Sequence, residues 1–281
     1  MAPRFSRPRL IDESDKQYRE HLARIMLTKE NQRAMRPPRA RELFGGEAEE
    51  ALRGWLARHY TLSERRIIEY LEHRGRNAIK KYRELDAVTL PDPKTIHVFE
   101  IKASRKAVSL RRAAQQLRDT QTILRMLFAR VYTTILLVDT GIPQTPDEAR
   151  QQLRQRLEDM AARGITPAGP LDPPPTLGEV LAQLPRVRLA ASPADIDPDP
   201  QVVSLLHFTV DDIIALAGAE NLHLDWDEED EEEPAETGEE AEESGGYAYS
   251  TGGAEEESDD ESPLAAALRK ALRDSAGGKD A

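Results

Sequence analysis

The chain has 281 residues, 39% of them hydrophobic, which is enough to build one substantial core. It contains no cysteine, so disulfides, thiolate metal sites and cysteine nucleophiles are excluded. It has no run of about 18 apolar residues, and its first residues, MAPRFSRPRL, lack the apolar region of a signal peptide. We therefore expect a soluble, cytoplasmic protein without a membrane partner.

Charge divides the chain into a basic body and an acidic tail. Residues 225–262 hold 19 Asp and Glu and no Lys or Arg, so the net charge of −12 divides into −19 there and +7 elsewhere. Residues 1–41 hold 11 Lys and Arg against 5 Asp and Glu, a balance that suits contact with phosphates. The acidic tail at 225–281 is too poor in apolar residues to form a core and is expected to be disordered.

Helical periodicity predicts three helices in the first 75 residues. The first covers residues 14–35, with Ser14 as its cap, and makes residues 1–40 a basic helical arm. The second covers residues 41–60, and the third covers residues 61–75.

Residues 84–104, ELDAVTLPDPKTIHVFEIKAS, change to the alternation of a β-hairpin. The turn comes from Pro-Asp-Pro-Lys, because proline cannot sit in a central ladder. A three-residue loop at 92–94 sets Asp86 opposite Glu100, and Lys102 follows two residues later on the same face. Charged groups buried without partners are costly, so this pattern indicates a ligand rather than a contribution to stability.

The remaining elements predict an α/β fold: a mixed central sheet flanked by helices on both faces. In chain order they are helix 109–129, strand 131–139, helix 147–164, a short helix in the proline-rich connector 165–200, and a strand and helix within 202–217. Thr209 or Asp211 is expected near the cap of that last helix. Within the tail, SPLAAALRKALRD at 262–274 has helical character.

Asp86 and Glu100 form a pair of like charges that repel each other unless a cation lies between them. Mg²⁺ is commonly bound by one or two carboxylates together with substrate phosphate oxygens. The amine of Lys102 is within reach of the same site, where it can orient a water or stabilise charge on phosphorus. The three residues therefore predict phosphodiester hydrolysis with Mg²⁺ or Mn²⁺.

ELD at 84–86 followed by EIK at 100–102 resembles the motif of the PD-(D/E)XK nuclease superfamily, and the order of elements over 41–139 resembles that family's core. The resemblance implies a restriction-endonuclease-like domain at 41–224. In it Asp86, Glu100 and the backbone carbonyl of Ile101 bind metal, and Lys102 is catalytic.

The resemblance also implies an acidic ligand from the first helix of that core. The candidates are Glu47 and Glu50, of which Glu47 lies nearer the apolar face. Gln116-Leu117 matches a Gln-Leu pair of RecB-like members and makes Gln116 a further catalytic candidate. Thr120 stands where those members have an aromatic residue, so the subtype is left open.

These features predict a metal-dependent DNA endonuclease. Two alternatives stay open: an inactive nuclease-like module that anchors a larger nucleic-acid-processing complex, and an RNA nuclease. The acidic tail and its terminal helix are a solubiliser or a site for a protein partner, and the sequence leaves self-association undecided.

Simpler interpretations also exist for single residues. The charged residues of the hairpin could form a surface cross-strand salt bridge, which contributes little, and Gln116 could be an ordinary polar flank. Glu84 is expected to face solvent or pair with an arginine, and His97 is expected to be structural.

Overall fold

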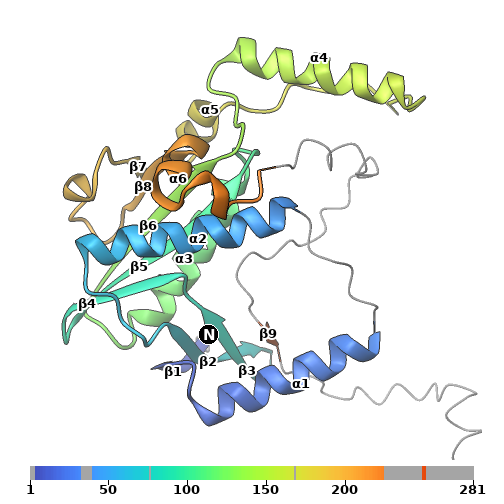
Figure 1. Ribbon diagram of the computed structural model, residues 1–281. Helices are drawn as coiled ribbons and strands as arrows, with labels where there is room; N and C mark the ends of the chain where they lie inside the picture. Colours follow the sequence, from blue (N-terminus) through green and yellow to red (C-terminus); the bar gives the residue numbers. More distant parts are fainter. Residues whose placement is uncertain (1–3, 33–39, 76, 168, 225–248, 251–281) are drawn as a thin grey trace, which may run out of the picture. The chain divides into compact units, whose positions relative to one another are not determined.

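A computed structural model of the chain describes residues 4–32, 40–75, 77–167, 169–224 and 249–250 (Figure 1). Most of the acidic tail, and the helix expected at 262–274, lie outside these residues. No helix in the described ranges is both long enough and apolar enough to cross a membrane.

The described elements form two sheets with helices around them. In chain order they are β1 (Phe5–Ile11), α1 (Lys16–Gln32), α2 (Ala40–His59), β2 (Ile67–Arg74), β3 (Asn77–Glu84), β4 (Ala87–Asp92), β5 (Thr95–Ser104), α3 (Ser109–Leu124), β6 (Arg130–Asp139), α4 (Pro146–Ala162), α5 (Leu177–Ala182), β7 (Val187–Leu189), the 3₁₀ turn Pro193–Asp195, β8 (Val203–Thr209), α6 (Val210–Ala217), the 3₁₀ turn Ala219–Asn221 and β9 (Tyr249–Ser250).

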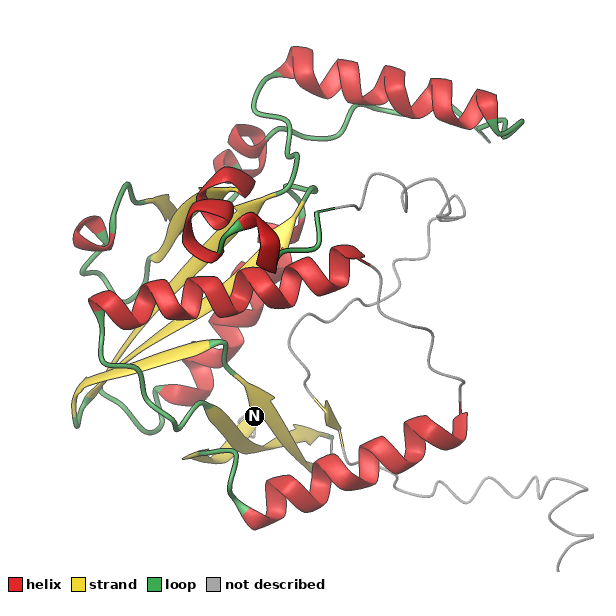
Figure 2. Cartoon of the chain, in the orientation of Figure 1, coloured by secondary structure: helices red, strands yellow, loops and turns green. Residues whose placement is uncertain are grey.

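The larger sheet has five strands in the order β4-β5-β6-β8-β7. β4 runs antiparallel to β5, whereas β5, β6, β8 and β7 are mutually parallel (Figure 2). β6 is central and buried along almost its whole length, as expected of a strand covered on both faces. The predicted α/β class, with a mixed sheet flanked by helices, is confirmed.

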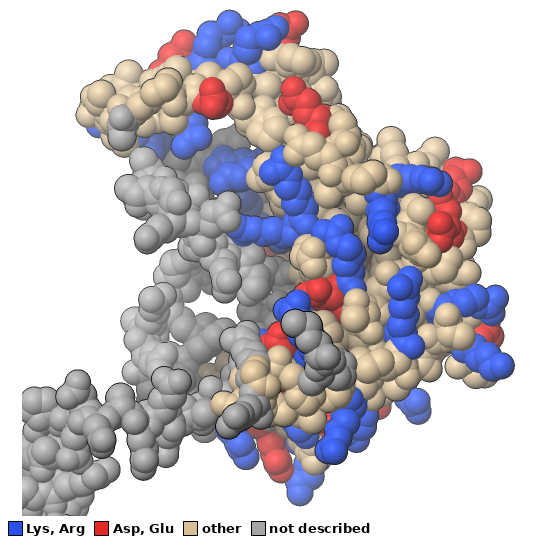
Figure 3. Space-filling model, turned by 180° about the vertical axis from the view of Figure 1, so that it is seen from behind, with Lys and Arg blue, Asp and Glu red and all other residues tan. Residues whose placement is uncertain are grey.

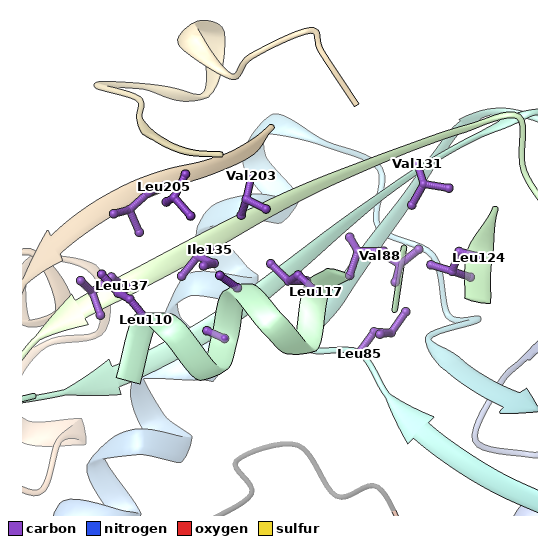
Figure 4. Packing of buried hydrophobic residues seen from close by; sticks show 14 of the residues in the cluster. Leu85, Val88, Leu110, Leu117, Leu124, Val131, Ile135, Leu137, Val203 and Leu205 are labelled. Carbon is purple, nitrogen blue, oxygen red and sulfur yellow. The ribbon is translucent and has the colours of Figure 1, made fainter. Parts of the chain in front are cut away.

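Helices cover both faces of this sheet because side chains alternate along its strands. On one face α3 packs on β5, β6 and β8, and the contact includes Leu110, Leu117, Ile135, Leu137 and Leu205 (Figure 4). On the other face lie α2 and α6, and that contact includes Phe44, Leu52, Phe99, Leu136 and Ile213.

The register of the β4–β5 hairpin is the one expected, although its turn differs. Asp92 pairs with Thr95, so the loop has two residues instead of the three predicted at 92–94. A bulge in β4 between Thr89 and Asp92 adds one residue to this strand. The pairing of Ala87 with Phe99 is therefore the same as with a three-residue loop. Continued by one residue, this register places Asp86 opposite Glu100.

The smaller sheet is antiparallel, in the order β1-β2-β3-β9. The helix predicted at 61–75 is wrong, because Ile67–Arg74 is strand β2, paired on both sides. Ile and Tyr favour strands, and a short apolar run does not distinguish strand from helix by itself. The deciding partner, β1, lies some sixty residues earlier in the chain.

The first helix is confirmed as α1, but its cap is Asp15 rather than Ser14. The Asp15 carboxylate accepts hydrogen bonds from the backbone N–H groups of Gln17 at 2.9 Å and Tyr18 at 3.1 Å. Tyr18 is buried against Tyr82 of β3. Together with strand β1, this contact makes the N-terminal segment part of the smaller sheet. The cap expected for the last helix is confirmed at Thr209.

Candidate active site

Asp86 lies directly before β4, where the chain enters the larger sheet. Its Oδ2 accepts a hydrogen bond from the backbone N–H of Ile101 at 2.6 Å. A strand residue directs its N–H and C=O toward the same neighbouring strand. The carbonyl of Ile101 therefore points toward the same side as its N–H group, where Asp86 lies directly before the first residue of β4. The resemblance implied a backbone ligand at this position.

Glu100 is 3% exposed and lies on the face of β5 that α3 covers. Its Oε2 accepts a hydrogen bond from Nε2 of Gln116 at 3.3 Å. Gln116 is thus directed at the carboxylate pair and is more than the polar flank of an amphipathic helix.

The two carboxylates are held in an environment that disfavours their charge. Burial, and then the nearby carboxylate of Glu49, raise the pKa of Asp86 to about 7. Burial and repulsion from Asp86 raise the pKa of Glu100 well above its ordinary value. Both carboxylates therefore resist ionisation together unless positive charge is brought to them.

Lys102 follows Glu100 on the same face of β5 and is half-buried. Its charge lowers the pKa of both Asp86 and Glu100, which places the ammonium group within electrostatic reach of the pair. No hydrogen bond or ion pair joins Lys102 to another residue of the described chain. The cross-strand salt bridge considered from the sequence is therefore not formed.

The acidic residue of α2 that acts on this pair is Glu49, not Glu47 or Glu50. Glu49 raises the pKa of Asp86 and of Glu100. Glu47 instead accepts a hydrogen bond from the backbone N–H of His223 at 2.7 Å and also contacts its ring. Glu50 is exposed.

The reason for this difference is the position of α6. The apolar side of α2 is broad because this helix packs on α6 as well as on the sheet. Trp55, on the flank that made Glu47 look closer to the core, meets Phe208 at a ring distance of 5.1 Å. Helical spacing puts Glu47 on the flank of α2 that carries Trp55 and puts Glu49 on the opposite flank.

Two arginines that the sequence did not single out, Arg83 on β3 and Arg66 directly before β2, connect this part of the chain to the site. Nη1 of Arg83, on β3, donates to the carbonyl of Gln116 at 3.1 Å and to Oγ1 of Thr120 at 2.7 Å. Nη1 of Arg66 donates to the carbonyl of Leu85, the residue before Asp86, at 3.3 Å. Arg83 also lowers the pKa of Glu100, and Arg66 that of Asp86.

Two other titratable residues of the hairpin region lie outside this group. Glu84 is half-buried and accepts a hydrogen bond from the hydroxyl of Tyr18, so the expected solvent or arginine contact is wrong. His97 is buried on the opposite face, with Nε2 2.8 Å from Oγ1 of Thr134 and its ring stacked on Phe99. Burial lowers the pKa of His97 to about 4, which supports the structural role expected for it.

A divalent ion fits the pair through its charge rather than through a complete set of side-chain ligands. Within the described ranges, no group of three or more His, Cys, Asp or Glu side chains is arranged to hold a metal. Mg²⁺, however, usually keeps several waters and binds one or two carboxylates plus substrate oxygens. The repulsion between Asp86 and Glu100 is the feature that such an ion would relieve.

Comparisons with protein-family models, curated proteins and solved structures found no match to this chain.

Proposed function

We propose that the protein is a metal-dependent endonuclease that hydrolyses phosphodiester bonds of DNA, built on a restriction-endonuclease-like PD-(D/E)XK core and working in the cytoplasm. The observation that carries the proposal is the convergence of Asp86, Glu100 and Lys102 where β4 begins beside β5. The Asp86–Ile101 hydrogen bond and the register of the hairpin define that arrangement.

The proposed roles follow from the chemistry of each group. Mg²⁺ or Mn²⁺, held by Asp86, Glu100 and the carbonyl of Ile101, would act as a Lewis acid toward a phosphate oxygen and a water. Lys102 stabilises the negative charge that grows on the phosphate as water oxygen bonds to phosphorus and the bond to the leaving sugar oxygen breaks. Gln116 holds Glu100 in position through its side-chain amide.

Cleavage of supercoiled plasmid in Mg²⁺ or Mn²⁺ tests this proposal. Asp86→Asn and Glu100→Gln should abolish cleavage, whereas Glu64→Gln, which alters an exposed carboxylate away from the pair, should leave it unchanged. Full cleavage by purified Asp86→Asn protein would remove Asp86 from the site.

Lys102 has a distinct expected signature. Lys102→Met keeps most of the side-chain volume but removes the charge, so turnover should fall more than Mn²⁺ affinity measured by calorimetry. Lys102→Arg should also fail, because a planar guanidinium does not replace a compact amine. Near-normal turnover of Lys102→Arg would show that the lysine supplies charge only.

The second candidate is a nuclease-like module that binds nucleic acid without cleaving it. One observation favours this second candidate. Asp86 and Glu100 are two candidate ligands, and the part of the chain that the structure describes holds no group of three acidic, His or Cys side chains placed to bind a metal. Binding of duplex DNA without cleavage in either metal would support it. A labelled RNA strand in the same assay tests the remaining alternative, an RNA nuclease.

A further inference from the structure

The outer side of α3 and the loop before it carry a concentration of positive charge. Residues 105–125 contain six Lys and Arg and one acidic residue, Asp119. The six cations are Arg105, Lys106, Arg111, Arg112, Arg118 and Arg125. Figure 3 shows Lys and Arg side chains gathered across the face turned away from the viewer in Figure 1, where α3 lies.

The single acidic residue of this stretch is already paired with β1. Asp119 lies 3.5 Å from the guanidinium of Arg4, which also contacts Glu72 at 3.2 Å. The side chain of Arg4 remains 61% exposed, whereas that of Glu72 is 6% exposed. The carboxylates of Glu72 and Asp119 are thus less exposed than the guanidinium side chain of Arg4, which lies at the surface.

Arg7 adds a cation from a strained part of β1. Its φ is +51°, a left-handed conformation that residues other than glycine rarely adopt, and Pro8 restricts it further. A register shift between Ser6 and Arg9 places Arg7 in a bulge of this strand. Arg7 is exposed and makes no hydrogen bond or ion pair with any residue in the described ranges.

This cationic surface lies on the same face of the sheet as the candidate active site. α3 packs on the face that carries Glu100, and Gln116 reaches that carboxylate. Arg112 is four residues before Gln116 and therefore lies on the same side of the helix. Cationic side chains thus extend from the border of the site along α3, where Arg111 and Arg112 are exposed and Arg118 is half-buried, and, through the Arg4–Asp119 pair, to the start of β1.

We propose that Arg4, Arg7, Arg111, Arg112 and Arg118, the α3–β1 surface, form the docking surface for the phosphate backbone of duplex DNA. The proposal rests on the nuclease function above and names the form of its substrate. Arginine suits phosphate geometry, and its charge is fixed at any physiological pH. Single strands are usually bound by stacking on exposed aromatic rings. α3 contains no aromatic residue, and Phe5 of β1 is buried.

Fluorescence anisotropy with a labelled duplex of random sequence tests this surface, in EDTA so that no strand is cut. The double variant Arg111→Gln/Arg118→Gln should bind several-fold more weakly at low salt. Its slope of log affinity against log salt should be shallower by roughly 1 to 2, because each phosphate that an arginine no longer neutralises removes about 0.9 from the slope. Arg7→Gln should weaken binding in the same direction, and Arg7→Lys should restore it.

The matched control is Arg154→Gln/Arg156→Gln, which removes the same charge from two exposed positions of α4. It should leave affinity and salt slope near those of the wild type, and thermal melting should show all variants folded. Equal losses in the α3 and α4 variants, or no loss in either, would overturn the proposal. So would a loss confined to a single-stranded oligonucleotide of the same length. Salt-dependent duplex binding by the α3–β1 surface without any cleavage would refute the nuclease proposal and leave the docking surface standing.

Discussion

Burial shifts the pKa values of Asp86 and His97 in opposite directions, although both belong to the same hairpin region. For His97 the pKa falls from 6.5 to about 4, so its stabilising contribution is complete above pH 6.5. That contribution is lost as pH falls toward 4, by up to roughly 3 kcal/mol. For Asp86 the pKa rises from 3.8 to about 7, so stability is present below pH 3.8 and is lost as pH rises toward 7.

We therefore expect the two trends to oppose each other in the metal-free wild-type protein between pH 4 and 6.5. Asp86→Asn should remove one of them. Glu100, whose pKa is also raised by burial, remains in this variant, so the free energy of unfolding should fall less steeply with pH than in the wild type and should exceed the wild-type value near pH 7. Urea denaturation in EDTA at a series of pH values measures both effects.

The double variant Asp86→Asn/His97→Gln is the control for that experiment. Because the buried Glu100 remains and the opposing trend of His97 is gone, the stability of this variant should fall as pH rises over the same interval. If metal-free Asp86→Asn is less stable than the wild type at neutral pH, the Asp86 carboxylate is not under the repulsion inferred here.

Helix α2 packs on both the sheet and α6, and its Glu49 is the glutamate that raises the pKa of Asp86 and Glu100. Glu49→Gln should weaken Mn²⁺ binding and cleavage at limiting metal, on the order of ten- to a hundred-fold as for residues that support metal ligands. Calorimetric titration of Mn²⁺ into each variant, followed by cleavage at several metal concentrations, measures the loss.

Two neighbours on the same helix provide controls for Glu49. Glu50→Gln changes an exposed residue and should have no effect. Glu47→Gln removes the acceptor of His223 and should lower thermal stability slightly without changing Mn²⁺ affinity. A loss of Mn²⁺ affinity in Glu47→Gln, with normal affinity in Glu49→Gln, would restore the helix ligand expected from the sequence.

For the whole molecule, the acidic tail has to be considered together with the rest of the chain, which carries +7. Residues 225–262 carry −19, and most of them lie outside the described residues. A run of carboxylates can compete with phosphates for the same arginines. Ending the chain at Leu224 should therefore raise affinity for random DNA at low salt, and the gain should shrink as salt rises because both interactions are screened.

Truncation also removes β9, which pairs Ser250 with Lys81 and Tyr249 with Tyr82 on β3. A variant with the 19 acidic residues of 225–262 changed to Gln or Asn keeps that strand and isolates the charge. Its affinity should match that of the truncated chain. Equal affinity of full-length and truncated proteins at low ionic strength would reduce the tail to a solubiliser.

The sequence by itself was sufficient for the α/β class and for the β4–β5 hairpin with Asp86, Glu100 and Lys102. Strand alternation and proline turn chemistry act over a few residues, and a one-residue slip would expose a buried face. The register of the hairpin is therefore the expected one, although its loop is one residue shorter than predicted. A bulge in β4 adds the residue that the loop lacks.

Only the tertiary structure decided the features that depend on partners far away in the chain. Ile67–Arg74 is a strand because β1 and β3 pair with it, and a short run of Ile, Tyr and Glu does not exclude a helix locally. The carboxylate of α2 that raises the pKa of Asp86 and Glu100 is that of Glu49, on a helix that packs on α6 as well as on the sheet. Arg83 reaches the site from β3, and Arg66 reaches it from the residue before β2, a strand that the local pattern did not predict. In each case the competing local energies are small, and contacts between distant segments determine the outcome.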